Sequence, residues 1–586
     1  MFTRVLVANR GEIAVRVIRA LDELGIESVA VYSEADRDAQ HVKRATHAYL
    51  LGPGPAAESY LKVDKLLEVI AESGAEAVHP GYGFLAENAA FARALEDAGV
   101  TFIGPPASAI DAMGSKTKAR ELMQNAGVPI VPGTTDPVET LEDAERIAEE
   151  IGYPVAVKAA GGGGGKGFRV ALEPDKLQDA FEGAAREGEK FFSDATVYLE
   201  RYLPDPRHVE VQVLADGEGN VVHLGERDCS IQRRHQKLIE ESPAPLVDAE
   251  LRERIGKIAV DAARAVDYRG AGTIEGLLSE DGEYFFLEMN TRVQVEHCVT
   301  EAVTGVDIVR EQILIAAGEP LGFGQDDIHW HGHAIECRIN AEDASKNFAP
   351  APGTVAHYRE PSGPGVRVDS GVLSGSEITP LYDPMVAKLI VWDADREKAT
   401  RRMARALKEF EIEGVKTLIP FHKAIMASEQ WAKGETCRDL IEDKQWLKTL
   451  AFDAAPKPDD GEDETVTKDY VVEVGGKRFE VRVHGEAGGA APVAGAAKAA
   501  PKKRERKASG GAGGGDTLAS PLQGNVFKVL VEEGAEVQEG ALVCIIEAMK
   551  MENEITAHKA GTIAELPIKE GAAVKSGDTL AVIKGG

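Results

Sequence analysis

The C-terminal segment of the chain, about the last 70 residues, contains an internal repeat. The run GAEVQEG at 534–540 returns as GAAVKSG at 571–577, a displacement of 37 residues. The same displacement carries Gly524 to Gly561. Two similar β-rich halves with matching glycine turns predict a small β sandwich with pseudo-twofold symmetry.

Lys550 lies midway between the two halves of this repeat. An apolar run at 542–546 leads into EAMKM at 547–551, and apolar spacing resumes at Ile555, so Lys550 is expected on a hairpin that joins the halves. The ordinary alternative is an exposed lysine with two methionines packed beneath it. The symmetric position favours instead a protruding amine that a modifying enzyme can reach.

The residues before the repeat change in composition. Residues 453–465 are acidic and contain proline, and 470–483 alternate around a Gly-Gly pair, which predicts a hairpin. Because an isolated hairpin is marginally stable, it is expected to pack on a neighbour or on a partner protein. Residues 487–516 are rich in Gly, Ala, Pro and Lys, with a basic run at 502–507. That run is either a nucleic-acid contact or part of a solvated linker, and the acidic remainder favours a linker spanning on the order of 30 Å.

Composition excludes several classes of protein. A chain of 586 residues is too long for one hydrophobic core, so several domains are expected. A net charge of −30 repels nucleic acid and anionic membranes. No apolar stretch is long enough for a bilayer, and no signal peptide begins the sequence, which predicts a cytoplasmic protein without nucleic-acid or membrane partners. Five scattered cysteines form no CxxC pair, which argues against a disulfide framework and a zinc site.

The N-terminal part alternates short apolar runs with helical spacing. The run at 5–8, the turn at 9–11 and the run at 26–32 indicate a βαβ opening, but no GxGxxG follows the first strand. Five glycines at 161–165 precede Lys166, between two strand-like runs. Bare glycines let backbone N–H groups approach phosphate oxygens, so a mobile phosphate-binding loop is predicted, with a floppy linker as the alternative.

A metal site is predicted around residue 280. The runs at 272–278 and 284–290 flank Asp281-Gly282 and predict a hairpin. Alternation along the strands is expected to put Glu275, Glu288 and Asn290 on one face. Two carboxylates and an amide, together with the phosphates of ATP, make a typical Mg²⁺ shell. Ordinary surface charge is the alternative, although both glutamates lie within apolar runs, where an unpaired charge is costly.

The next residues continue this polar pattern. If the segment stays extended, alternation aims Arg292, Gln294 and Glu296 to one side. A cation, an amide and a carboxylate beside a metal suit a small oxyanion that must lose a proton. His297 is expected to serve the structure.

Two families resemble this chain. Residues 516–586 resemble the biotinyl domains, whose acceptor motif stands intact as AMKM at 548–551 and implies biotin amide-linked to Lys550. Lipoyl carriers share that fold, but they resemble the site less because they typically lack the two flanking methionines. Residues 1–446 resemble the biotin carboxylases of the ATP-grasp class, with NRGEIA, HPGYGFLAEN, GGGGGKG, PRHVEVQ, RRHQK and EMNTRVQVEH in order.

The resemblance implies a fold and cofactors. The expected fold is an α/β and α+β ATP-grasp biotin carboxylase, then a flexible linker, then an all-β biotinyl (barrel-sandwich) domain. The expected cofactors are covalent biotin, ATP and Mg²⁺ or Mn²⁺. The implied domains are 1–113 (N-terminal), 114–325 (ATP-grasp, with a mobile lid at about 131–203), 326–446 (C-terminal), 447–485 (connector, a partner-docking element), 486–516 (linker) and 517–586 (carrier).

The resemblance also implies roles for single residues. The nucleotide is expected to contact Lys116, Lys158, Gly163, Gly164, Gly165, Lys166, Glu200, Leu203, His208, Gln232 and His235. Bicarbonate is expected at Lys237, Arg292, Gln294, Val295 and Glu296, with Glu296 as the base. Arg338 would stabilise the biotin enolate. The implied chemistry is attack of bicarbonate on ATP to give carboxyphosphate, whose breakdown releases CO₂ beside biotin, while the freed phosphate removes the N1 proton.

Two positions depart from the family pattern. Gly276 stands where the family usually carries Phe, and the connector is too short for the β domain that docks a carboxyltransferase in longer relatives. No carboxyltransferase region fits in the chain, so a separate β subunit is expected, in a hetero-oligomer such as α6β6, together with a biotin protein ligase.

Several acceptors and activities remain open. The favoured acceptors are acetyl-CoA and propionyl-CoA, and the alternatives are methylcrotonyl-CoA and pyruvate. One further alternative is an ATP-grasp ligase with a lipoyl carrier. Another is a non-enzymatic carrier or scaffold, and the intact polar sets at 275–296 disfavour this last alternative.

Overall fold

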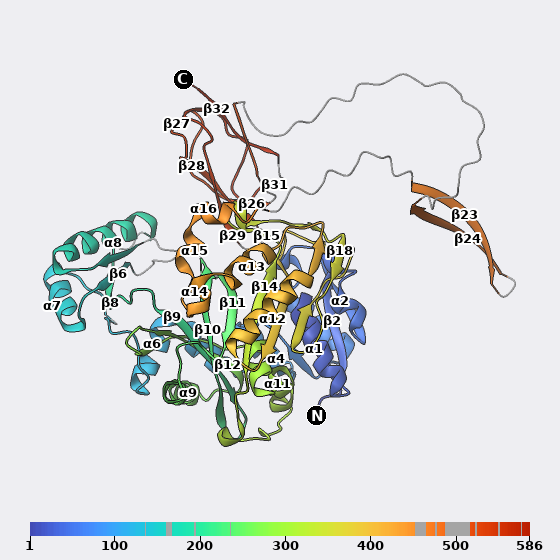
Figure 1. The fold of residues 1–586 in the computed structure, drawn as a ribbon, viewed down its shortest axis with the longest axis horizontal. Coiled ribbons are helices and arrows are strands. Elements are labelled where there is room, and N and C mark those ends of the chain that lie inside the picture. Colours follow the sequence, from blue (N-terminus) through green and yellow to red (C-terminus); the bar gives the residue numbers. More distant parts are fainter. Residues whose placement is uncertain are drawn as a thin grey trace.

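The computed structural model describes residues 1–134, 136–159, 167–192, 195–234, 236–451, 465–474, 477–486, 516–521, 524–548, 551–575 and 577–585. Figure 1 shows the chain from the blue N-terminal sheet to the red C-terminal strands. Among these residues, no helix combines the length and the apolar character that crossing a membrane requires.

The chain begins with a parallel five-stranded sheet of order β3-β2-β1-β4-β5. The predicted βαβ opening is confirmed, because α1 lies between the paired strands β1 and β2 and packs Ile13, Val17 and Leu21 into the core beside Val5 and Val7. The elements are β1 (Arg4–Val7), α1 (Gly11–Glu23), β2 (Glu27–Ser33), α2 (Gln40–Arg44), β3 (His47–Gly52), α3 (Val63–Ser73), β4 (Ala77–His79), α4 (Ala89–Asp97), β5 (Thr101–Phe102), α5 (Ala107–Gly114) and α6 (Lys116–Asn125).

A small antiparallel sheet of order β7-β6-β8 occupies the segment expected to form the lid. It has its own core, in which Val155 and Val157 pack with Leu177 and Leu199. The mobility of this segment stays a prediction. The elements are α7 (Leu141–Ile151), β6 (Val155–Ala159), β7 (Phe168–Ala171), α8 (Leu177–Phe192) and β8 (Val197–Arg201).

One eight-stranded sheet, of order β13-β12-β9-β10-β11-β14-β21-β19, forms the centre of the carboxylase region. The sequence-based domain limit at 325 falls at the start of the 3-10 helix η4 (Gln325–Asp327), before β14, and the sheet runs across it through the pairing of β11 with β14. The strands are β9 (Arg207–Ala215), β10 (Val221–Arg233), β11 (Gln236–Ser242), β12 (Gly270–Leu278), β13 (Tyr284–Asn290), β14 (His333–Asn340), β19 (Val366–Ser370) and β21 (Met385–Asp393).

The ATP-grasp half of this sheet has two faces of opposite character. Alternate residues such as Val209, Val211 and Ile274 pack in one core with Ile255 and Ala259 of α9 (Ala249–Arg264). Because side chains alternate along a strand, the residues between them point to the other face, and these are polar.

Shorter elements surround the sheet. The helices are α10 (His297–Thr304), α11 (Ile308–Ala316), α12 (Arg396–Glu409), α13 (Ile419–Met426), α14 (Glu429–Lys433), α15 (Arg438–Glu442) and α16 (Lys444–Lys448). Short strand pairs are β15 (Glu342–Asp343) with β16 (Ala349–Pro350), β17 (Gly353–Thr354) with β20 (Glu377–Ile378), and β18 (His357–Arg359) with β22 (Glu411–Glu413). The 3-10 helices are η1 (Glu34–Asp36), η2 (Ala56–Glu58), η3 (Pro174–Lys176), η4 (Gln325–Asp327) and η5 (Ala344–Lys346).

The connector contains the predicted hairpin. Strands β23 (Thr465–Val474) and β24 (Lys477–Glu486) pair antiparallel over their whole length, so its arms are longer than the sequence pattern indicated. The glycine pair at its turn and the linker at 487–515 lie outside the described residues.

The C-terminal domain is the predicted sandwich, with two four-stranded sheets of order β25-β32-β30-β27 and β29-β28-β26-β31. The repeat relates them, because adding 37 residues carries β27 onto β31, β26 onto β30 and β28 onto β32, which exchanges the two sheets. The strands are β25 (Thr517–Ala519), β26 (Gly524–Val529), β27 (Glu536–Val537), β28 (Leu542–Ala548), β29 (Met551–Thr556), β30 (Gly561–Glu565), β31 (Ala573–Val574) and β32 (Thr579–Lys584).

Candidate active site

A row of charged and polar side chains crosses the polar face of the eight-stranded sheet. Cross-strand partners have side chains on the same face of a sheet. The register therefore sets these partners beside one another: Glu288 with Glu275, Glu275 with Glu210, Glu210 with Arg227, Glu240 with Glu336, Arg338 with Lys388, and Lys388 with Asp369.

Lys237, on β11, connects three carboxylates on this face of the sheet. Its Nζ donates to Glu210 at 2.5 Å, to Glu275 at 2.8 Å and to Glu296 at 2.7 Å, so all three ammonium protons are used. Burial lowers the pKa of Lys237, but the three carboxylates outweigh burial and hold that pKa well above its usual value. The lysine is therefore a fixed positive charge among buried carboxylates.

Glu296 connects Lys237 to Arg338. Arg338 Nη2 donates to Glu296 Oε2 at 2.9 Å, and its Nε donates to Glu240 Oε1 at 2.6 Å. Burial raises the pKa of Glu296, but Lys237, Arg338 and Arg227 hold that pKa well below its usual value. Burial raises the pKa of Glu240 to about 7, against the opposing charge of Arg338. The base expected from the sequence is therefore ionised, and a second carboxyl group behind Arg338 titrates near neutrality.

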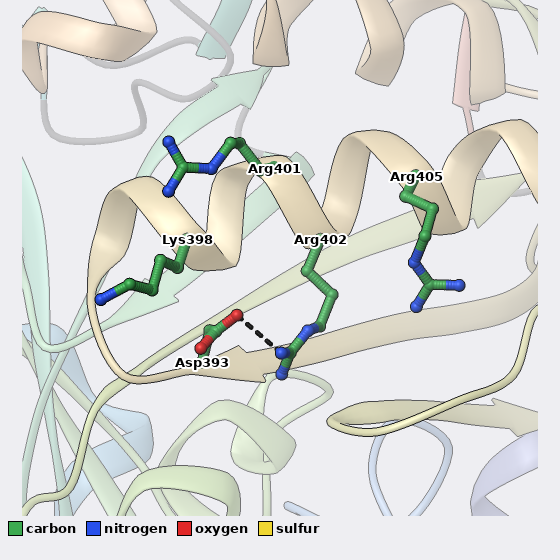
Figure 2. Close-up of a pocket in the computed structure, with 5 residues that line it drawn as sticks. All are labelled: Asp393, Lys398, Arg401, Arg402 and Arg405. Carbon is green, nitrogen blue, oxygen red and sulfur yellow. Dashed lines mark ion pairs between the residues drawn. The ribbon is translucent and has the colours of Figure 1, made fainter.

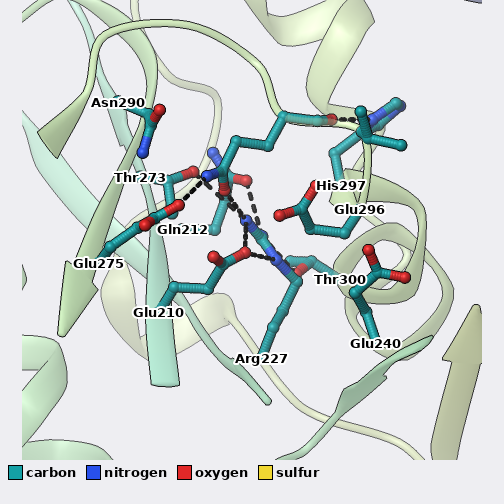
Figure 3. A network of polar contacts seen from close by, with 12 residues as sticks. Glu210, Gln212, Arg227, Glu240, Thr273, Glu275, Asn290, Glu296, His297 and Thr300 are labelled. Atoms are coloured by element: carbon teal, nitrogen blue, oxygen red, sulfur yellow. Dashed lines mark hydrogen bonds and ion pairs between the residues drawn. The ribbon is translucent and has the colours of Figure 1, made fainter. Parts of the chain in front are cut away.

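The predicted metal hairpin has the predicted geometry. Glu275 pairs with Glu288, and Thr273 pairs with Asn290, so Glu275, Glu288 and Asn290 share one face. Burial raises the pKa of Glu275, but His208 and Lys237 outweigh it and hold that pKa below its usual value. Figure 3 shows Asn290 above Glu275, and its buried Nδ2 lacks a hydrogen-bond partner among the described residues. An ionised carboxylate beside a second one and an amide fits the oxygen-rich shell that Mg²⁺ prefers.

The segment after this hairpin is not extended. The condition under which strand alternation would point Arg292, Gln294 and Glu296 to one side is therefore not met. Residues 291–296 bend and turn, and Glu296 (φ −82°, ψ 8°) stands immediately before α10. Gln294 Nε2 nevertheless donates to Glu275 Oε1 at 2.6 Å, and Arg292 Nη2 donates to Asn290 Oδ1 at 2.8 Å. Contacts with neighbouring strands, rather than strand alternation, bring this segment to the metal hairpin.

Two buried side chains, those of Lys388 and His297, contact backbone carbonyls of the same segment. Lys388 Nζ, fully buried on β21, donates to the carbonyl of Val295 at 2.8 Å. His297 is fully buried, its Nδ1 lies 2.8 Å from the carbonyl of Gln294, and burial lowers the pKa of its ring to about 3. The ring is therefore neutral at physiological pH and packs within the protein, as a structural residue does.

Other predicted nucleotide contacts lie in two places. In the lid sheet, Lys158 Nζ donates to Glu200 Oε1 at 2.8 Å. On the central sheet, His208 Nε2 lies 3.0 Å from Glu275 Oε2, so His208 adjoins the metal hairpin. Leu203 is buried against Val131 and Phe285. Gln232 is half-buried on β10, opposite Lys237 in the register.

Several predicted residues lie wholly or in part outside the described residues. Lys116 begins α6, but its side chain lies outside the described part. Gly163, Gly164, Gly165, Lys166, His235 and Lys550 also lie outside the described residues. The strands that flank Lys550 pair antiparallel as far as Ala548 and Met551.

Sequence reasoning missed four residues of the site. Glu210, Arg227, Glu240 and Glu87 each bind a predicted residue, the last through an ion pair of 2.7 Å with Arg292 Nε. For Glu210 a signal existed, because RHVEVQV at 207–213 alternates polar and apolar residues, as a strand with one polar face does.

The structure shows why glycine fits at position 276, where the family usually carries Phe. A Cβ built on Gly276 would overlap the ring of Tyr284, and Tyr284 Oη donates to the carbonyl of Val209 at 3.2 Å. The tyrosine therefore occupies the space that a side chain at position 276 would take.

A surface pocket lies away from this site, on α12. Figure 2 shows Lys398, Arg401, Arg402 and Arg405 along the helix, with Asp393 beneath them. Each cation has an acidic partner: Asp395, Glu397, Asp393 and Glu409 respectively. The pocket is therefore electrically balanced, as an ordinary solvated helix face is.

Family matches cover the carboxylase region and the C-terminal sandwich. Residues 1–110 match the "Biotin carboxylase, N-terminal domain", and residues 115–323 match the "Carbamoyl-phosphate synthase L chain, ATP binding domain". Residues 336–443 match the "Biotin carboxylase C-terminal domain", and residues 516–583 match "Biotin-requiring enzyme".

Individual relatives agree with these matches. The chain is 48% identical over 590 residues to the biotin-dependent acyl-coenzyme A carboxylase alpha3 subunit of Mycobacterium leprae, covering 99% of this chain and 98% of the relative. It is 55% identical over 443 residues to a pyruvate carboxylase subunit of Methanothermobacter thermautotrophicus, covering 76% of this chain and 90% of the relative.

A solved structure has the same fold. The biotin carboxylase domain dimer of Hydrogenobacter thermophilus 2-oxoglutarate carboxylase, in complex with MgADP, ADP and bicarbonate, superposes with a TM-score of 0.70 at 50% identity. The match covers 78% of this chain and 100% of that chain. The chain belongs to the biotin-dependent carboxylases, as an ATP-dependent biotin carboxylase joined in one polypeptide to its biotinyl domain.

Proposed function

We propose that this chain carboxylates biotin on its own Lys550 and supplies a separate carboxyltransferase subunit that acts on a short-chain acyl-CoA, acetyl-CoA or propionyl-CoA. The observation that supports this acceptor is the end-to-end match to an acyl-coenzyme A carboxylase alpha subunit, which includes the connector and the carrier. The pyruvate carboxylase subunit matches over 76% of the chain only. Pyruvate, 2-oxoglutarate and methylcrotonyl-CoA are the competing acceptors.

Mg²⁺ is proposed to bind at Glu275, Glu288 and Asn290. Support comes from their common face and from the ionised state of Glu275. When bound, the metal neutralises phosphate charge and orients the phosphates of ATP. Lys158, which the lid sheet holds beside Glu200, is proposed to contact the phosphates, together with Lys116 and the glycine loop at 163–166.

Bicarbonate is proposed to bind between Lys237, Arg292, Gln294 and the backbone of Val295, with Glu296 as the base. A base must be ionised when bicarbonate arrives, and the cations around Glu296 keep it so. Those cations also favour an anionic substrate beside it. Because Lys237 and Arg338 hold both oxygens of Glu296, bicarbonate must displace or share one of these bonds to reach the base.

Arg338 is proposed to hold the biotin oxygen as negative charge develops on it. A guanidinium that is charged at every accessible pH suits this task, and Glu240 fixes its orientation through Nε. Arg338 Nη2 donates to Glu296, and this contact supports neighbouring positions for the two proposed steps.

The acceptor is tested by affinity purification of the tagged chain, identification of the co-purifying protein and assay of the complex against a panel of acyl-CoAs, pyruvate and 2-oxoglutarate. The proposal predicts turnover with acetyl-CoA or propionyl-CoA. Turnover with a 2-oxo acid alone would contradict it. The mass of the purified complex also tests the proposed α6β6 assembly.

A further inference from the structure

Arg227 is a fully buried arginine of the central sheet that has no assigned role. Its side chain, which Figure 3 shows between Glu210 and Thr300, makes five hydrogen bonds, one for each N–H of a guanidinium. The acceptors are Glu210 Oε1 (2.7 Å), Gln212 Oε1 (2.8 Å), Thr300 Oγ1 (3.0 Å), Thr273 Oγ1 (3.3 Å) and Gln294 Oε1 (2.7 Å).

The contact with Gln294 fixes the orientation of an amide. A guanidinium has donors and no acceptor, so the amide oxygen of Gln294 must face Arg227. The amide nitrogen then faces Glu275, to which it donates at 2.6 Å. The reversed amide would set its oxygen against the Glu275 carboxylate and its NH₂ group against the guanidinium. Both contacts would be repulsive.

Arg227 also acts on the bicarbonate and metal groups through a second residue, Glu210. One oxygen of Glu210 accepts from Arg227 Nε, and the other accepts from Lys237 Nζ at 2.5 Å. Because both oxygens are engaged, the position of Arg227 sets the position of this carboxylate. The carboxylate in turn holds the lysine that bonds to Glu275 and Glu296.

We propose that Arg227 is a positioning residue that orients the Gln294 amide and the Glu210 carboxylate, and thereby sets the bicarbonate and metal groups. The inference rests on the proposed function, because it assumes that Gln294 and Glu275 act on bicarbonate and the metal. Thr300 belongs to α10, which begins directly after Glu296, so the same arginine also ties that helix to the sheet.

The competing explanation is that Arg227 only holds the fold together. Arg207 is a matched control, because it is also buried on this sheet and pairs with Asp228 at 2.7 Å. Its other contact is the carbonyl of Gly434, away from Lys237 and Gln294. Arg207→Lys is expected to weaken these two contacts, with Asp228 and with the Gly434 carbonyl, without disturbing the Gln294 amide.

The test uses the biotinylated full-length chain with Arg227→Lys, Gln294→Ala, the double variant and Arg207→Lys. A lysine keeps the charge at 227 but cannot reach all five acceptors. Three quantities are measured: the KM for bicarbonate in ATP cleavage, the affinity for Mn²⁺·ADP by calorimetry without turnover, and the affinity for ADP without metal. Thermal unfolding of each variant is recorded in parallel.

Arg227→Lys is expected to raise the bicarbonate KM and weaken Mn²⁺·ADP binding by about 10-fold or more, with metal-free ADP binding unchanged. In the Gln294→Ala background the same change should have a smaller effect than in the wild type, because only the route through Glu210 remains and groups that act through one another are not additive. Arg207→Lys should lower the unfolding temperature and change neither constant.

The inference is overturned if Arg227→Lys lowers only the unfolding temperature, or if its effect on the bicarbonate KM multiplies with that of Gln294→Ala. If Gln294→Ala itself leaves that KM unchanged, the proposed role of Gln294 is wrong and the inference falls with it. Should Arg227→Lys fail to fold, Thr300→Val decides the question. It removes one acceptor of the arginine and is expected to raise the bicarbonate KM about 3-fold, and an unchanged KM refutes the inference.

Discussion

Replacing Lys237 by methionine is expected to destabilise the central sheet in a pH-dependent way. The substitution keeps most of the side-chain volume and removes the charge that three buried carboxylates share. Leaving a buried charge without its partner costs about 3–5 kcal/mol. Here Glu210 keeps Arg227, Glu296 keeps Arg338 and Glu275 keeps His208, so the loss is expected near the lower end, about 3 kcal/mol.

The pH dependence follows from the sign of the pKa shifts. In the wild type Glu275 and Glu296 have depressed pKa values, so they stabilise the fold above their unfolded pKa. In the variant burial is less opposed and both pKa values are higher than in the wild type. The stability gap between the two proteins should therefore widen as the pH rises from the depressed wild-type pKa values to the higher values of the variant.

Hydrogen exchange of the β9 and β12 amides measures the opening free energy of this sheet separately from the other domains. Lys398→Met is the control, because Lys398 is exposed on α12 and its loss should leave the exchange unchanged. A loss that does not depend on pH, or one below about 1 kcal/mol, would refute the reasoning.

Three further changes test other parts of the site. Glu240→Gln removes a carboxyl whose pKa rises from 4.5 to about 7 on folding. The variant should therefore gain about 3 kcal/mol relative to the wild type as the pH rises through that window, measured by exchange of the β11 amides, whereas parallel pH profiles would contradict this. Gly276→Phe should cost at least about 1–3 kcal/mol by thermal unfolding, because the new ring overlaps Tyr284, and Tyr284→Ala should recover part of that cost; a single variant as stable as the wild type would show that the space is free. Arg338→Ala should bind ATP normally by calorimetry and lose carboxylation of free biotin, and surviving turnover would rule out its proposed role.

Local patterns predicted the parts of this fold whose contacts are close in sequence. The repeat predicted the C-terminal sandwich, and the metal hairpin pairs Glu275 with Glu288 as strand alternation implied. The continuous central sheet could not be predicted in this way. Its joining pair, Ile239 with Cys337, is separated by almost a hundred residues, and neither strand carries a local signal for the other.

Contacts between residues that are far apart in the sequence also limit how much of the site can be predicted. The resemblance named the residues that are proposed to face substrate, but Arg227 and Glu240, which bind other side chains of the protein, give no pattern of their own. The prediction for residues 291–296 assumed an extended strand. This assumption is wrong, because the chain turns there to begin α10. Contacts across strands hold this segment, and a single sequence does not encode them in its local spacing.

The measurement that tests the central claim most directly follows radiolabelled bicarbonate onto the carrier. The biotinylated chain is incubated with ATP, Mg²⁺ and labelled bicarbonate and then cleaved in the linker at 487–515. We expect label on the fragment that contains Lys550 only when ATP is present, and none in Lys550→Ala. A mature protein without covalent biotin, or ATP hydrolysis that is indifferent to bicarbonate and biotin, would contradict the account.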